Sequence, residues 1–249
     1  MHKKIVLSIV AISTLFTFSC KKEDGQTLEK GNVNIEFKHN VGSEDLEFNN
    51  KKYTNAIGHI YEVRTLKYFI SNVTFTKSDG YNEVIKKPIY INASDTVTLI
   101  KDNAIQLPLG TYTSIGFTFG LDSTMNVTDT LTSVEATAMA WGMQGGGYHY
   151  MKLEGTYDSL GIDSATKNYT LHTGASMGKP YDFHVTFDNS AFTLDQEGLN
   201  IQVKMDINEW FTDPNKYDFE EYGKMIMMKM EAQMKLKENG ASVFSIGVK

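Results

Sequence analysis

Apolar and polar residues alternate along most of this chain with the two-residue period of half-buried strands. In residues 33–39, VNIEFKH, every second position is apolar and His39 continues that face, so His39 is predicted to point inward at a strand end. The phase of residues 65–77 slips near Ser71–Asn72, as a β-bulge would make it do. Further strand-like segments separated by turns occupy residues 88–92, 96–100, 109–120, 148–155, 168–172, 181–187 and 200–207. Short strands with frequent turns predict an all-β fold, an antiparallel β-sandwich.

Residues 211–240 break this pattern and predict one helix near the C-terminus. Asp213–Pro214 suits an N-cap followed by the first helical residue, and Asn239–Gly240 suits a stop. Met227, Met230 and Met234 follow at i, i+3 and i+7. Five Met fall in residues 225–234, which could form a Cu(I) site, although Met at helical spacing more often fills gaps in a core. A last strand is predicted at residues 242–248.

The N-terminus carries a basic start and a short apolar run, which is typical of a secretory signal peptide over residues 1–19. Cys20, the single cysteine, stands where that run stops and resembles the lipidated cysteine of bacterial lipoproteins. Charged residues 20–31 predict a tether, which leaves residues 32–249 as one domain. The expected location is the outer membrane, on its periplasmic or cell-surface side, with the lipid anchor as the only membrane attachment.

Charge and motifs exclude several functions. The net charge is −6 and the sequence holds no basic stripe, so nucleic acid is not an expected partner. No GxSxG, HExxH or CxxC motif occurs, and the glycines at 145–147 follow no βα unit. We therefore expect no enzyme and no catalytic residues.

The histidines carry the remaining chemistry. His149 shares its predicted face with Met151 and Leu153, and His172 stands where a strand runs into a loop. A single inward His is more often a hydrogen-bonded core residue than a ligand, so both interpretations stay open. Neutral imidazole suits copper, zinc, iron and nickel, while a thioether favours Cu(I).

The order of several motifs resembles the MbnP-like family of extracytoplasmic copper-binding proteins. They are IEFKHNVG, LEFNNKKYTNAIGHIYEV, LKYFISNVTF, LGTYTSIGFTFGLD, MAWGMQGGGYHYMKLEG, NYTLHTG and ENGASVFSI. The resemblance implies a β-sandwich that binds one copper ion with histidines and an oxidised tryptophan. That tryptophan is converted to kynurenine by a partner related to dihaem cytochrome c peroxidases.

Carried over by motif, the resemblance implies His39 and His172 as metal ligands. His149 becomes a third ligand or a group that orients the ligands, and Trp141 the residue for oxidation. Many relatives carry a second tryptophan where Met143 stands here. Met143 is therefore a candidate soft ligand.

The resulting hypothesis is an extracytoplasmic lipoprotein that binds copper for its acquisition or handling. The alternative is a metal-free β-sandwich adhesion module for a glycan or protein, with Tyr148 and Tyr150 as exposed binding aromatics.

Overall fold

A computed structural model describes residues 28–131, 134–142, 146–161 and 164–249. The predicted signal peptide, Cys20, most of the tether and Met143 lie outside these residues. The first strand starts at Lys30, so the end of the predicted tether belongs to the folded domain.

The strands of the described residues form two sheets, which confirms the predicted β-sandwich. The smaller sheet has five strands in the order β14 (Phe244–Val248), β13 (Leu199–Asp206), β1 (Lys30–Val41) and β2 (Glu44–Asp45), with β7 (Ile100–Pro108) also paired to β1. Neighbouring strands are antiparallel except β1 and β13, which run parallel.

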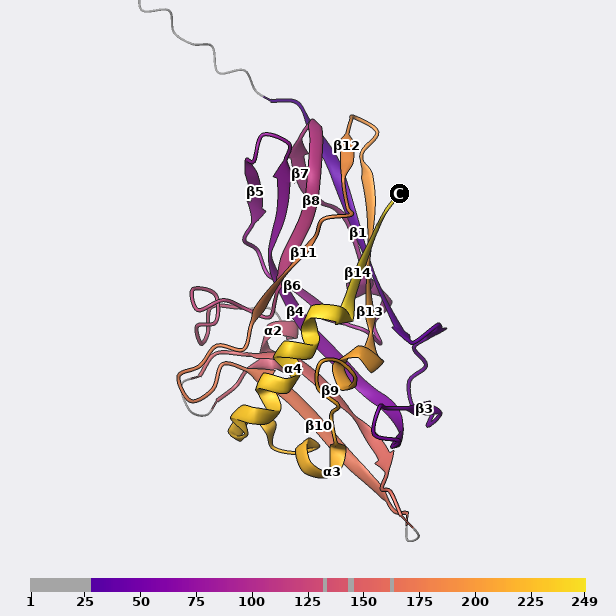
Figure 1. Cartoon of the computed structure of the whole chain (residues 1–249). Coiled ribbons are helices and arrows are strands. Elements are labelled where there is room, and N and C mark those ends of the chain that lie inside the picture. The colour runs from indigo at the N-terminus through magenta and orange to yellow at the C-terminus, as the bar shows by residue number, and fades with distance from the viewer. Residues whose placement is uncertain (1–27, 132–133, 143–145, 162–163) are drawn as a thin grey trace, which may run out of the picture.

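The larger sheet has nine strands in the described residues and carries the site discussed below. Its main path is β10 (Thr166–Gly174), β9 (His149–Asp158), β4 (Ile60–Lys77), β8 (Gly110–Phe119) and β11 (Phe183–Phe187). Short strands β3 (Tyr53–Thr54), β5 (Asn82–Ile85) and β6 (Ile89–Asn92) pair with β4, and β12 (Phe192–Leu194) pairs with β8. Figure 1 shows the two sheets together in its upper half, with β9 and β10 extending below them.

The inward faces of both sheets form one aromatic-rich core. Phe37 of β1, Phe117 and Phe119 of β8 and Phe244 of β14 are all buried in it. Trp210, from the 3-10 helix η1 (Ile207–Phe211), is 1% exposed and lies 5.0 Å from Phe119 between ring centroids. The predicted bulge in β4 is confirmed, because the β4–β8 register shifts between Ser71 and Thr74.

The predicted strand at residues 96–100 is wrong, because Thr96–Leu99 forms the short helix α1. The Asp95 carboxylate accepts a hydrogen bond from the Val97 amide at 3.1 Å and caps the helix. A favourable N-cap outweighs the β propensity of two threonines and a valine here.

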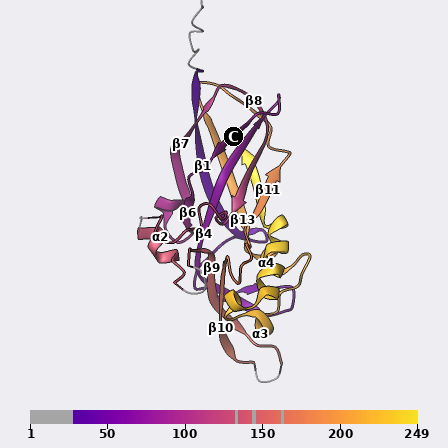
Figure 2. The same cartoon turned by 90° about the vertical axis from the view of Figure 1, so that its left-hand side faces the viewer.

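The C-terminal helix is shorter than predicted and is preceded by two small ones. These are α3 (Phe219–Tyr222), the 3-10 helix η2 (Ile226–Met228) and the main helix α4 (Met230–Val243). The helices therefore begin after Asp218, which caps α3, and not at Asp213–Pro214. Figure 2 shows α4 and the helix α2 (Val134–Met139) on opposite sides of the molecule.

The predicted stop at Asn239–Gly240 and the predicted methionine face of the helix are both wrong. Gly240 lies within α4, where an added Cβ would stand 2.0 Å from Phe183 Cζ, so the glycine allows close packing. Asn239 is fully buried and its side-chain amide donates to the Trp210 carbonyl. Met230 and Met234 instead face outward, 46% and 38% exposed.

Candidate metal centre

His149 and His172 meet on the outer face of the larger sheet. Their ring centroids are 4.9 Å apart, with the ring planes at 63°. His149 opens β9 and His172 lies near the end of β10, the edge strand beside it. The structure therefore brings together two of the three predicted histidines.

A β-bulge causes this meeting and corrects the predicted face of His149. Thr173 pairs with Met151, but the next residue, Gly174, pairs with His149, so Tyr150 is the extra residue. Paired residues project to the same face, and successive residues project to opposite faces. His149 thus joins the face of His172 and not that of Met151. It is nevertheless buried, 4% exposed, because loops cover the outer face here.

Glu154 is hydrogen-bonded to His172 and orients its ring. The Nε2 atom of His172 lies 2.6 Å from Oε1 of Glu154, which projects from the same face of β9. This hydrogen bond, chiefly, lowers the pKa of the Glu154 carboxyl. When neutral His172 donates its Nε2–H to this carboxylate, its Nδ1 keeps the free lone pair that a metal ion needs.

His149 is held neutral by its surroundings. Burial, and next the neighbouring His172, lower the pKa of His149 from 6.5 to about 3. Its Nδ1 atom is buried and has no hydrogen-bond partner among the described residues. A buried polar nitrogen left unpaired is costly, and a bound metal ion would satisfy it.

Trp141 covers His149 from the loop that follows α2. The Trp141 and His149 rings lie 4.9 Å apart between centroids, at 59°. Like His149 Nδ1, the indole Nε1 of Trp141 is buried without a hydrogen-bond partner in the described structure. The Trp141 amide donates to the Gly147 carbonyl at 2.8 Å, which ties this loop to the start of β9.

The glycines before β9 shape this loop. Gly146 and Gly147 have φ of 71° and 85°, where residues with a Cβ are strained. A Cβ on Gly147 would also lie 2.5 Å from Oδ1 of Asn126, which accepts a hydrogen bond from the Tyr148 amide. Close packing on the loop at residues 122–131 therefore requires glycine and sets the position of Trp141.

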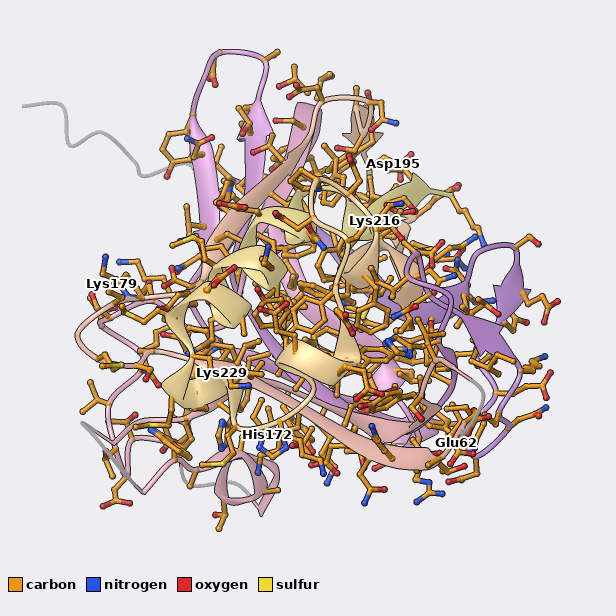
Figure 3. The ribbon with its side chains drawn as sticks, turned by 60° about the horizontal axis from the view of Figure 1, so that its bottom comes forward. Glu62, His172, Lys179, Asp195, Lys216 and Lys229 are labelled. Carbon is orange, nitrogen blue, oxygen red and sulfur yellow. The ribbon has the colours of Figure 1, made fainter. Side chains whose placement is uncertain are left out.

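A methionine-bearing segment runs along the free edge of β10. The Thr170 amide donates to the Gly223 carbonyl at 2.7 Å, and η2 follows directly. A cavity of about 240 Å³ lies here, lined by Trp141, Thr170, His172, Met225, Ile226, Met227 and Met228. Figure 3 shows His172 next to the segment that carries Lys229, the residue after η2.

His39 lies elsewhere. It points inward as predicted, 8% exposed, and its Nε2 lies 3.0 Å from the Tyr68 hydroxyl. Tyr68 pairs with Met151 on the inner face of the larger sheet, whereas His149 and His172 occupy the outer face. The sheet itself therefore separates His39 from the histidine pair.

The adhesion alternative loses its stated basis, because Tyr148 and Tyr150 are buried and not exposed. They are 3% and 1% exposed and pack in a second small core with Phe69, Leu121 and Met139. The Tyr148 hydroxyl accepts a hydrogen bond from the Leu131 amide at 2.9 Å. These aromatics hold the loops over the outer face.

The spacing of the pair leaves room for one metal ion between the two imidazoles. With metal–nitrogen bonds of about 2.0–2.1 Å, two coordinating imidazole centroids stand roughly 5–6 Å apart. The observed 4.9 Å requires little movement. Within the described residues no group of three or more His, Cys, Asp or Glu could hold a metal.

Comparison with known proteins identifies the family. The family model MbnP matches residues 30–230. The chain belongs to the MbnP family. Among solved structures, MbnP from Methylosinus trichosporium matches with a TM-score of 0.55 and 12% identity, over 89% of this chain and 99% of that one. At this identity the match shows the shared fold. A comparison with curated proteins finds no match.

Sequence reasoning missed Glu154 and the methionine segment as parts of this site. Glu154 lies two positions from Lys152 on the polar face of β9, which reads as an ordinary solvated surface. The five closely spaced Met were the available signal for the methionine segment, but their helical spacing predicted that they fill a core.

In the part of the chain that the structure describes, no helix has the length and apolar character needed to span a membrane.

Proposed function

We propose that this protein binds one copper ion outside the cytoplasm, through His149 and His172, and acquires or hands on the metal without catalysis. The observation that carries this proposal is the pair of imidazoles 4.9 Å apart under an indole ring, with two buried nitrogens that have no hydrogen-bond partner among the described residues. Membership of the MbnP family supports copper as the metal.

The chemistry of the donors also favours copper. Uncharged imidazole and thioether groups surround the site, and hard cations such as calcium and magnesium require several oxygen ligands instead. Glu154 supplies an oxygen, but it is engaged with His172. Its role in this proposal is to orient His172.

Trp141 is the residue we propose for oxidation to kynurenine by a dihaem cytochrome c peroxidase-like partner. With peroxide as the oxidant, the C2–C3 bond of the indole is cleaved, C3 gains oxygen as a ketone, C2 leaves as formate after hydrolysis, and the ring nitrogen becomes an aniline beside His149. Intact mass measurement after co-expression with such a partner tests it, because the conversion adds about 4 Da. An unchanged mass, or the same gain in Trp141→Phe, would contradict this part of the proposal.

Lipid attachment at Cys20 and residence at the outer membrane complete the proposed setting. Globomycin-sensitive processing and radiolabelled palmitate incorporation test the anchor. A Cys20→Ser variant should lose the label and leave the membrane fraction.

Copper titration of the purified domain tests the central proposal. Wild type should bind one equivalent, and the double variant His149→Ala/His172→Ala should lose most of that binding. His39→Ala and the exposed His184→Ala serve as controls and should bind as wild type does. No binding by wild type, or undiminished binding by the double variant, would refute the proposed function.

A further inference from the structure

Thioether side chains form much of one wall of the cavity beside His172. Three of the four residues from Met225 to Met228 are methionines, and all three line it together with Trp141. Met225 is 73% exposed and Met228 is 43% exposed. Single exposed apolar residues are ordinary, but neighbouring ones at the mouth of a cavity indicate a binding role.

Met227 lies deeper, beside the backbone at Gly174 and His149. It is 4% exposed, and a Cβ added to Gly174 would stand 3.3 Å from its Cε atom and 3.4 Å from Cα of His149. The φ of Gly174 lies outside the left-handed region, so space and not conformation makes glycine suitable there. Gly174 pairs with His149 at the β-bulge, and its lack of a side chain leaves space there for the Met227 side chain.

The backbone fixes this segment against the sheet. Met225 has φ 58° and ψ 35°, a left-handed conformation that is uncommon for a residue with a long side chain. The Ser176 hydroxyl donates to the Met227 carbonyl, and the Lys229 ammonium donates to the Glu221 carbonyl at 2.7 Å. The sulfur atoms are therefore carried by an anchored turn.

We propose that the segment from Met225 to Met228 makes this site selective for Cu(I). The Met227 sulfur supplies a soft ligand beside His149 and His172, and Met225 and Met228 receive the ion at the mouth of the cavity. This inference rests on the proposed function and adds the oxidation state of the metal and its route of entry. Thioether sulfur is a soft ligand and favours Cu(I) over the harder Cu(II), which supplies the selectivity.

A core-filling role does not account for Met225 and Met228. Core methionines are buried, whereas Met225 and Met228 are exposed and contribute to a cavity. Met230 and Met234 are also exposed, but they lie on α4 and do not line it. They provide a matched control within the same stretch of sequence.

The experiment compares Cu(I) and Cu(II) affinities, each measured by competition with a chelator of known affinity. The test variant is Met225→Leu/Met227→Leu/Met228→Leu, and the control is Met230→Leu/Met234→Leu. Leucine conserves volume and so limits the effect on folding. The test variant should lose at least about tenfold in Cu(I) affinity, the scale on which groups around a metal act. The Cu(II) affinity of the test variant should stay within about twofold of wild type. The Cu(I) and Cu(II) affinities of the control variant should do the same, since about twofold is far below the tenfold effect of groups around a metal.

X-ray absorption of the wild-type Cu(I) complex provides a readout independent of any variant. A copper–sulfur shell should be present in wild type and in the control, and absent in the test variant. A nitrogen-only shell in wild type, or equal Cu(I) affinity in wild type and the test variant, overturns this inference. If the methionine inference fails in this way but His149→Ala/His172→Ala abolishes copper binding, the proposed function stands without the methionine ligands. If wild type binds neither ion, both fail.

Discussion

The imidazole rings of His149 and His172 stand 4.9 Å apart because Gly174, and not Thr173, is the β10 partner of His149. One extra residue in β9, Tyr150, turns His149 from the inner face of the sheet to the outer one. The candidate metal centre of this MbnP-family chain depends on that single bulge.

Removing the carboxylate partner of His172 should weaken copper binding. Glu154→Ala takes away the acceptor 2.6 Å from His172 Nε2, so the ring loses its fixed orientation. We expect about a ten- to hundredfold loss of copper affinity, measured by chelator competition. Glu154→Gln keeps an acceptor and should recover part of it. Glu220→Ala, which breaks the exposed pair with Lys167, is the control. Equal affinities in all these proteins would contradict the role of Glu154.

His39 should make the fold sensitive to acid. Burial lowers its pKa from 6.5 to about 4, so the unfolded chain takes up a proton that the folded chain refuses. The stability that neutral His39 contributes is complete above about pH 6.5 and is lost as the pH falls towards about 4, by up to about 3 kcal/mol.

Urea denaturation of the copper-free protein at several pH values measures this effect. His39→Gln cannot be protonated, so its unfolding free energy should fall less than that of wild type between pH 6.5 and 4. His184→Gln is the comparison, at an exposed position of β11 where burial also lowers the pKa of the imidazole; it should recover less of the lost stability than His39→Gln. Parallel curves for wild type and His39→Gln would show that His39 does not carry the acid sensitivity.

Copper binding should quench the fluorescence of Trp141. The indole lies 4.9 Å from His149, so an ion on that imidazole is close enough to accept its excitation energy. Trp210 is buried in the main core and should supply the emission that remains. In Trp141→Phe, quenching at one equivalent of Cu(II) should largely disappear while binding by titration persists. Equal quenching in Trp141→Phe would place the ion away from His149.

Gly240→Ala should destabilise the packing of α4 on the larger sheet. The new methyl group would stand 2.0 Å from Phe183 Cζ, and overpacking of this kind costs about 1–3 kcal/mol. Gly247→Ala meets no atom within 4 Å and should change the unfolding free energy by less than about 0.5 kcal/mol. Thermal and urea unfolding measure both.

A smaller residue at position 183 should relieve the clash. Gly240→Ala/Phe183→Leu should cost less than the sum of its two single changes, since the added methyl group then has room. Additive costs would show that Gly240 is needed for another reason.

Two of the β-bulges, in β4 and in β9, show what a sequence can and cannot reveal. The bulge in β4 was predictable, because the alternation in residues 65–77 visibly slips at Ser71–Asn72. The bulge at Tyr150 leaves no such mark. Residues 147–151 are all buried, because one core lies beneath them and loops cover them, so alternation there carries no information on direction.

The predicted methionine face of the C-terminal helix is wrong for a related reason. Spacing at i, i+3 and i+7 indicates one helix face only if the chain is helical throughout, and here η2 and α4 are separate elements. The left-handed Met225 begins η2, and nothing in the residue type predicts that conformation.

The sequence by itself determined the β-sandwich class, the inward direction of His39, the methionine-rich segment near the C-terminus and the family. These follow from local periodicity and from motif order, which need no knowledge of distant contacts. Only the tertiary structure decided that His149 meets His172, that Trp141 and Met227 close over them, and that His39 lies across the sheet. Those relationships depend on strand register and loop docking between segments far apart in the chain, where one added residue reverses the face on which a side chain lies.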